Sequence, residues 1–183
     1  MPEQWVRVVN PPADPLYAVA TVNPAIKGTY LHSIANVPGT VASQTFITLF
    51  NPVGSGKVLS LGTVAFSYSN TTPATETNPV RGYRISAAPT GGTLISAANL
   101  QRFNTTQPNP AGIVRVDNPT VTLDGALFNS PAPLDNRSSN VHNVDIPPGA
   151  GPFVMLPGEG LAINKLAGTT SATWNITLVW AEI

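Results

Sequence analysis

Apolar and polar residues alternate along most of this 183-residue chain, in short runs that end at turn residues. The alternation is clearest at 43–50 (SQTFITLF), 57–68 (KVLSLGTVAFSY) and 172–183 (ATWNITLVWAEI). A period of two places successive side chains on opposite faces of a β-strand, so we expect 43–50 to be a half-buried strand. Shorter runs bring the predicted total to about eight to ten strands, and they lie at 80–87, 93–95, 141–146, 151–156 and 161–166.

Turn residues separate these runs at short intervals. The segments 51–56 (NPVGSG) and 157–160 (PGEG) predict tight turns between strands. Asp124-Gly125, within 121–128 (VTLDGALF), predicts a β-hairpin, because Asp-Gly accepts the positive φ angles of a type I′ turn. Helix signals are weak, and only 96–102 is expected to form one helical turn.

Residues 1–28 differ from the rest because prolines interrupt their short apolar pieces. Proline at this density forbids a long hydrogen-bonded ladder and favours extended backbone. We therefore divide the chain into an extended N-terminal arm, 1–28, and one β-sandwich domain, 29–183. Large apolar side chains of the arm need burial on the body of this chain or on a neighbour, and the expected interface residues are Trp5, Leu16 and Tyr17.

The composition supports an all-β fold. Only 10% of the residues are charged, against about 25% in an average soluble domain. The 19 prolines and 15 glycines leave little room for helices, whereas Thr, Ser and Asn suit exposed strands and turns. Strand number and chain length predict a jelly-roll-like β-sandwich. An immunoglobulin-like sandwich is the alternative, although the chain is long for it and has no cysteine pair.

Charge and cysteine content argue against several function classes. The formal net charge is +0 and no stretch is a basic run, so we expect no nucleic-acid partner. A net charge near zero gives little repulsion between copies, which favours a homo-oligomer. The absence of cysteine favours folding in the cytoplasm. The N-terminus does not resemble a signal peptide and no apolar stretch approaches the ~20 residues that span a bilayer, so we expect no membrane partner.

Two motifs invite a chemical interpretation, and each has a simpler one. The segment 54–57 (GSGK) resembles part of a phosphate-binding loop, but such a loop needs a further upstream glycine and a following helix. We expect a strand after Lys57, and therefore an ordinary turn. His32 and His142 have no evident ligand partners in the sequence, and no cysteine could complete a metal site. We predict no metal ion and no cofactor.

The carboxylates also have structural interpretations. The aspartates stand beside Pro, Gly, Asn or strand ends, where Asp commonly serves turns, and they are Asp14, Asp117, Asp124, Asp135 and Asp145. No Gly-x-Ser-x-Gly nucleophile elbow occurs. We predict that the protein is not an enzyme and has no catalytic residues. A glycoside hydrolase with two carboxylates in one cleft stays open as a rival.

The aromatic residues fall into two groups. Alternate residues of the last run, Trp174, Ile176, Leu178 and Trp180, share one strand face and are expected in the core. The rings expected at the surface, next to polar loops, are Tyr68, Tyr83 and Phe103. Exposed rings flanked by Asp or Asn would favour a carbohydrate-binding module.

Two turn-and-strand motifs resemble β-rich virion proteins encoded among the head genes of tailed bacteriophages. The first motif is 50–58 (FNPVGSGKV). The second is 156–161 (LPGEGL), followed after a short strand by 173–180 (TWNITLVW). The resemblance covers chiefly 44–69 and 154–183 and contains no catalytic signature.

Such virion proteins are usually capsid decoration (cement) proteins or head and tail fibre modules. The resemblance implies a structural virion protein that is made in the host cytoplasm and sits on the capsid surface, where it stabilises a phage head by bridging capsomers. Its implied partners are the major capsid protein and further copies of itself, with a trimer preferred. The alternative is a carbohydrate-binding head- or tail-fibre or adhesin module.

Overall fold

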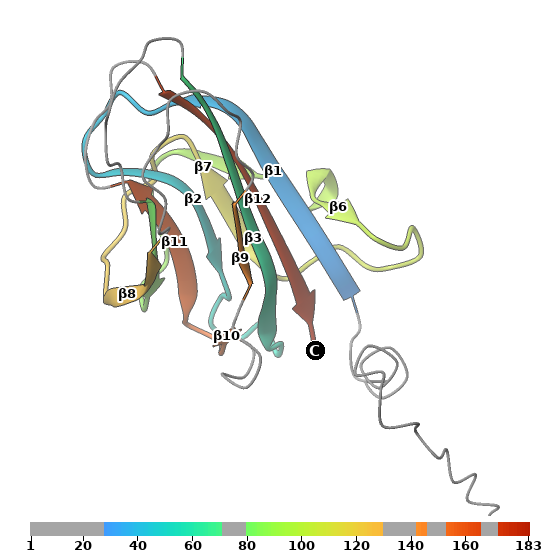
Figure 1. The fold of residues 1–183 in the computed structure, drawn as a ribbon. Helices are drawn as coiled ribbons and strands as arrows, with labels where there is room; N and C mark the ends of the chain where they lie inside the picture. The colour runs from blue at the N-terminus through green and yellow to red at the C-terminus, as the bar shows by residue number, and fades with distance from the viewer. Residues whose placement is uncertain (1–27, 71–79, 130–141, 146–152, 166–171) are drawn as a thin grey trace, which may run out of the picture.

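The computed structural model describes residues 28–70, 80–129, 142–145, 153–165 and 172–183 (Figure 1). These residues form strands and one short 3-10 helix, arranged as two packed antiparallel sheets. The all-β sandwich predicted from the sequence is therefore confirmed. Residues 1–27 of the predicted arm lie outside the described residues, with Trp5, Leu16 and Tyr17. Gly28 is the first residue of the first strand.

We call the two sheets sheet A and sheet B. Sheet A contains β1 (Gly28–Pro38), β3 (Leu59–Asn70), β6 (Gln101–Arg102), β9 (His142–Asp145), β10 (Phe153–Met155) and β12 (Ala172–Glu182). Its order is β10-β3-β12-β1-β6, and β9 also pairs with β3. Sheet B contains β2 (Gln44–Phe50), β4 (Val80–Ile85), β5 (Thr93–Ile95), β7 (Ile113–Val116), β8 (Gly125–Asn129) and β11 (Gly160–Lys165). Its order is β5-β7-β2-β11-β4-β8.

The strand pairs are nested, which identifies the sandwich as a jelly roll. The first strand, β1, pairs with the last, β12, and β2 pairs with β11. Further inward, β3 pairs with β9 and β10, and β4 pairs with β8. A chain that wraps as one long folded-back hairpin gives this order, which is that of a double-sheet jelly roll. The remaining strands β5, β6 and β7 are inserted between β4 and β8.

The main core lies between the two sheets. Strand β12 turns every second side chain inward, as its period-two pattern predicts, and the buried residues are Trp174, Ile176, Leu178 and Trp180. The ring centroids of Trp180 and Tyr30 lie 5.8 Å apart, and those of Trp174 and Phe46 lie 5.7 Å apart. Full burial of a large apolar side chain is worth about 1.5–3 kcal/mol, so this row holds the sheets together.

A second, smaller apolar cluster lies on the outer face of sheet B. Phe50, Ile85 and Ala162 are buried there, and Ile113 and Val121 pack against them. Because both faces of β2 are covered, all seven of its residues are buried. The prediction of a half-buried strand at 43–50 is therefore wrong. Alternation along a strand does not indicate what covers its second face.

Two connections cover the outer face of sheet B, and we call them the straps. The first strap, 86–92, joins β4 to β5, and the second, 117–124, joins β7 to β8, so each runs from one side of the sheet to the other. Thr90 and Thr120 exchange two backbone hydrogen bonds of 3.0 and 2.7 Å, which tie the straps together. The second strap is also fixed to β2, because the backbone N–H of Thr45 donates to Asn118 Oδ1 at 3.0 Å.

The hairpin predicted at 121–128 does not form. Gly125 begins β8, and β8 pairs with β4 instead of with 121–123. The φ of Gly125 is +148°, far from the φ of about +60° or +90° that a type I′ turn uses. Residues 121–123 belong to the second strap, where Val121 packs against the outer cluster. The need to cover Phe50 and its neighbours overrides the local Asp-Gly signal.

The other predicted elements are present with shifted ends. Strands β3, β4, β5, β9, β10, β11 and β12 overlap the runs singled out from the sequence, and a 3-10 helix, η1 (Ala97–Asn99), lies inside the predicted turn at 96–102. The described residues contain twelve strands, more than expected. Strands β1, β6 and β7 were not predicted. Strands β6 and β7 are too short to show a period, and a register shift between Ile34 and Val37 interrupts the alternation of β1.

Candidate docking surface

The outer face of sheet A carries no charged side chain at the outward positions of β1, β12 and β3, three strands that lie side by side (Figure 1). We call it the A face. Each of its residues alternates with a buried core residue, and each is at least partly exposed. Its members are Thr173, Asn175, Thr177, Val179 and Ala181 on β12, Thr29, Leu31 and Ser33 on β1, and Ser60, Thr63, Ala65 and Ser67 on β3.

Polar side chains of the A face bond to one another across the strands. Ser33 Oγ and Thr177 Oγ1 are 2.8 Å apart, and Asn175 Nδ2 donates to Ser67 Oγ at 3.1 Å. Asn175 Oδ1 accepts a hydrogen bond from the backbone N–H of Asn36 at 2.8 Å. A polar group costs free energy on burial mainly when its hydrogen bonds are lost. Another surface could therefore cover these four side chains, Ser33, Ser67, Asn175 and Thr177, at little cost in free energy.

Two turns close one end of the sandwich and are hydrogen-bonded to each other. The N–H of Asn51 donates to Glu159 O at 2.8 Å, and the N–H of Gly158 donates to Asn51 O at 2.7 Å. The buried Asn51 amide also donates to the carbonyls of Lys57 and Met155 at 2.8 and 2.9 Å. We call this unit the Asn51 corner. It joins the two turn-and-strand motifs at 50–58 and 156–161, and nothing in the sequence alone indicates that they meet.

The Asn51 corner confirms the turn predicted at 54–57. Gly54 and Gly56 have φ of +82° and +64°, a conformation that glycine adopts without strain. The N–H of Ser55 donates to Pro52 O at 3.1 Å, and strand β3 follows the turn instead of a helix. A phosphate-binding loop uses the N-terminus of the helix that follows it, and no helix follows this turn.

Apolar side chains stand at the tips of this corner. Val53 is 84% exposed and Leu156 is 52% exposed. The nearby charges are engaged locally: Arg84 Nη1 lies 2.9 Å from Glu159 Oε2, and the Arg84 guanidinium carbon lies 4.7 Å from the centroid of the Phe153 ring. The corner is thus a small apolar tip beside a surface ion pair.

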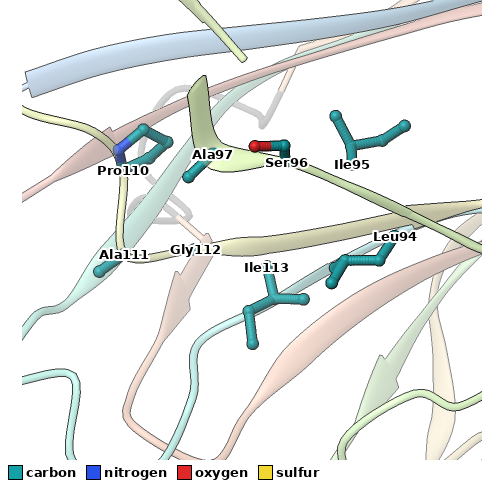
Figure 2. Close-up of a pocket in the computed structure, with 8 residues that line it drawn as sticks. All are labelled: Leu94, Ile95, Ser96, Ala97, Pro110, Ala111, Gly112 and Ile113. Carbon is teal, nitrogen blue, oxygen red and sulfur yellow. The ribbon is translucent and has the colours of Figure 1, made fainter. Parts of the chain in front are cut away.

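A pocket of about 420 Å³ opens where β5 and η1 diverge from residues 110–113, and we call it the β5–β7 pocket (Figure 2). Leu94 and Ile113 lie on the same side of the two strands in Figure 2, and Leu94 is 54% exposed. Seven of the eight lining residues are apolar or glycine, and the complete lining is Leu94, Ile95, Ser96, Ala97, Pro110, Ala111, Gly112 and Ile113. The pocket therefore suits an aliphatic or aromatic group.

Titratable groups of the described residues do not gather into a reactive cluster. Burial raises the pKa of the Tyr30 hydroxyl, the Glu182 carboxylate raises it further, and the Arg102 guanidinium opposes both. Burial lowers the pKa of His32. No group of three or more His, Cys, Asp or Glu among the described residues could hold a metal ion. The structure describes the backbone of His142 and Asp145 but not their side chains.

The remaining residues singled out from the sequence are scattered. Asp117 and Asp124 are exposed in the second strap, whereas Asp14 and Asp135 lie outside the described residues. Among the rings expected at the surface, Phe103 is 63% exposed, Tyr83 is half-buried, and the side chain of Tyr68 is not described. The A face was missed by sequence analysis because its members were treated as the ordinary polar sides of strands.

No family model, no curated protein and no solved structure matches this chain. In the part of the chain that the structure describes, no helix is long and apolar enough to cross a membrane.

Proposed function

We propose that this chain is a structural virion protein, a capsid decoration (cement) protein that stabilises a phage head by bridging capsomers. The observation that carries the proposal is the A face, which has no charged side chain at its outward positions on β1, β12 and β3 and in which four polar side chains bond to one another. The partner at this face is the major capsid protein. The function needs no catalytic residue and no cofactor, and involves neither nucleic acid nor membrane. The protein is made in the host cytoplasm and acts on the capsid surface.

Docking would rest on non-covalent contacts and involve no catalytic step. Protein interfaces are depleted of charged residues at their centres, and the A face has none at its outward positions on β1, β12 and β3. Each apolar Å² withdrawn from water is worth about 25 cal/mol, and self-bonded hydroxyls add little opposing cost. A trimer that contacts several capsomers at once gains avidity without any new contact.

Binding to capsids that lack decoration protein tests this function. In Thr177→Arg, a charged side chain stands at the centre of the A face, and we expect the affinity in a co-sedimentation assay to fall at least about tenfold. The matched control is Thr122→Arg, which places the same charge at an exposed position of the second strap. The proposal is wrong if the unaltered chain does not bind capsids, or if both variants bind as it does.

The proposal also requires an assembly state. We expect sedimentation velocity at micromolar concentration to show a discrete oligomer, with a trimer preferred, because a chain of zero net charge has little self-repulsion. A clean monomer over the whole range, with no partner present, would count against a bridging role.

A carbohydrate-binding fibre or adhesin module is the second candidate. Phe103 favours it, because the ring is 63% exposed and a polar turn follows it, in which Asn104 Oδ1 accepts from the N–H and hydroxyl of Thr106. Aromatic rings beside such groups can stack on sugars. Saturable glycan binding that Phe103→Ala abolishes, with no capsid binding, would favour this candidate.

A further inference from the structure

The β5–β7 pocket lies close to the point where the N-terminal segment joins the sandwich. Gly28, the first residue of β1, is the register partner of Glu182 in β12. The buried Glu182 carboxylate accepts hydrogen bonds from the backbone N–H groups of Ala111 and Gly112 at 3.0 and 2.9 Å. These two residues form a wall of the pocket. A single residue, Glu182, therefore links the start of β1 to the pocket, by strand pairing on one side and by its carboxylate on the other.

A second connection leads to the same place. The Tyr30 hydroxyl donates to Pro108 O at 3.1 Å, and the Arg102 guanidinium donates to Gln107 O at 2.8 Å. These bonds fix the loop that leads into Pro110, another lining residue. The residues that follow the N-terminal segment thus hold the pocket wall in place.

The lining of the pocket suits an apolar side chain, and the neighbouring outer edge of β5 suits an extended segment. No ionisable residue lines it, and its rim residue Leu94 is 54% exposed. Strand β5 is the terminal strand of sheet B among the described residues, so its outer edge can hydrogen-bond to added backbone. A short uncharged apolar run close to Gly28 is 16–20 (LYAVA).

We propose that the β5–β7 pocket binds the N-terminal segment of the same chain through Leu16 and Tyr17. Tyr17 stands eleven residues before Gly28, and an extended segment of that length reaches up to about 36–40 Å. A tether this short keeps the segment at about millimolar effective concentration, which favours the chain's own pocket over that of a second copy. This inference concerns the chain alone and does not depend on the virion role.

The absence of cysteine makes a direct test possible in the full-length chain. The test pair is Tyr17→Cys with Leu94→Cys, and the control pair is Tyr17→Cys with Val53→Cys, which joins the same segment to another exposed residue. A segment that is tethered but not docked should form both disulfides at similar rates. We expect the test pair to close within one chain at least about tenfold faster under mild oxidation, followed by non-reducing electrophoresis and peptide mass spectrometry.

Two results would overturn the proposal. The first is equal closure rates for the two pairs. The second is efficient cross-linking between separate chains when the single variants Tyr17→Cys and Leu94→Cys are mixed, because the pocket would then hold the segment of a second copy. A readout without cysteines is hydrogen exchange over 16–20, which we expect to accelerate at least about tenfold in Leu94→Glu but not in Leu123→Glu, a matched exposed position on the second strap. Unchanged exchange in both variants would contradict docking.

Discussion

The two outer faces of this sandwich differ in whether other parts of the chain cover their outward side chains. On sheet B, Phe50 and Ile85 point outward, and with the straps across them they are only 4% and 0% exposed. On sheet A, the outward positions of β1, β12 and β3 hold small polar and apolar residues that stay at least partly exposed. The chain itself covers the outer face of sheet B, whereas the A face stays partly exposed among the described residues.

Side-chain choice accounts for this difference. A large outward apolar residue such as Phe50 needs cover, and sheet B obtains it from two connections that are bonded to each other through Thr90 and Thr120. The A face needs no cover to be stable, because pairs such as Ser33 and Thr177 satisfy each other in water. The same pairs stay satisfied when a protein surface displaces the water, which is what a docking face requires.

The largest effect should come from the covered face. Phe50→Ala removes a buried ring from the outer cluster of sheet B, and we expect it to lower the free energy of unfolding by about 3–5 kcal/mol. Val179→Ala on the A face should cost less than about 1 kcal/mol, because that side chain is partly exposed. Urea titrations of both variants measure the contrast. Similar losses in the two variants would show that the faces do not differ in the way described.

A slightly smaller loss is expected at the Asn51 corner, where both sheets end. Asn51→Ala leaves the carbonyls of Lys57 and Met155 without their side-chain donor, and we expect a cost of about 2–3 kcal/mol. Asn99→Ala, at an exposed position of η1, is the matched control and should be nearly neutral. If the two thermal melts coincide, the corner contributes nothing to stability.

The sequence was informative where a local pattern and the tertiary structure agree. Residues 172–183 alternate, and β12 buries Trp174 and Trp180 as predicted. The turn at 54–57 was predicted for a local reason, its glycines, and it forms. The sequence failed where distant segments decide the outcome, as at Asp124-Gly125, where the second strap takes the place of a hairpin.

The surfaces themselves could not be predicted in the same way. The A face depends on the register between β1, β12 and β3, which lie far apart in the chain. Its residues, such as Asn175 and Ser67, look like ordinary outward polar positions until the pairing brings them together. The Asn51 corner likewise depends on contacts between residues about one hundred positions apart, such as Asn51 and Met155. Such contacts leave no periodic signal in one sequence.

A modest pH effect is expected from β1, the strand at one side of the A face. Burial lowers the pKa of His32 in the folded chain below its ordinary value of about 6.5. The unfolded chain therefore takes up the proton more readily, so His32 reduces stability as the pH falls below about 6.5 and has no such effect above it. His32→Gln should flatten the dependence of the melting temperature on pH between 7 and 5. An unchanged slope would contradict this assignment.

The smallest effect on the fold should come from the N-terminal segment. Deletion of residues 1–27 leaves β1 intact, because β1 begins at Gly28. We expect a β-rich circular-dichroism spectrum and a cooperative melt within about 5 °C of that of the full chain. We also expect weaker self-association or weaker capsid binding, because the truncation removes Trp5, the expected interface residue that the β5–β7 pocket does not bind. An insoluble or molten product would show that these residues belong to the fold of the sandwich.

The most direct test of the docking role is an electron cryo-microscopy reconstruction of capsids decorated with this protein. We expect density for the sandwich on the outer surface of the shell, with β1, β12 and β3 toward the capsomers and the straps toward solvent. Density with the straps against the shell and the A face toward solvent would contradict the account. Capsids that carry no such density after saturation with the protein would contradict it as well.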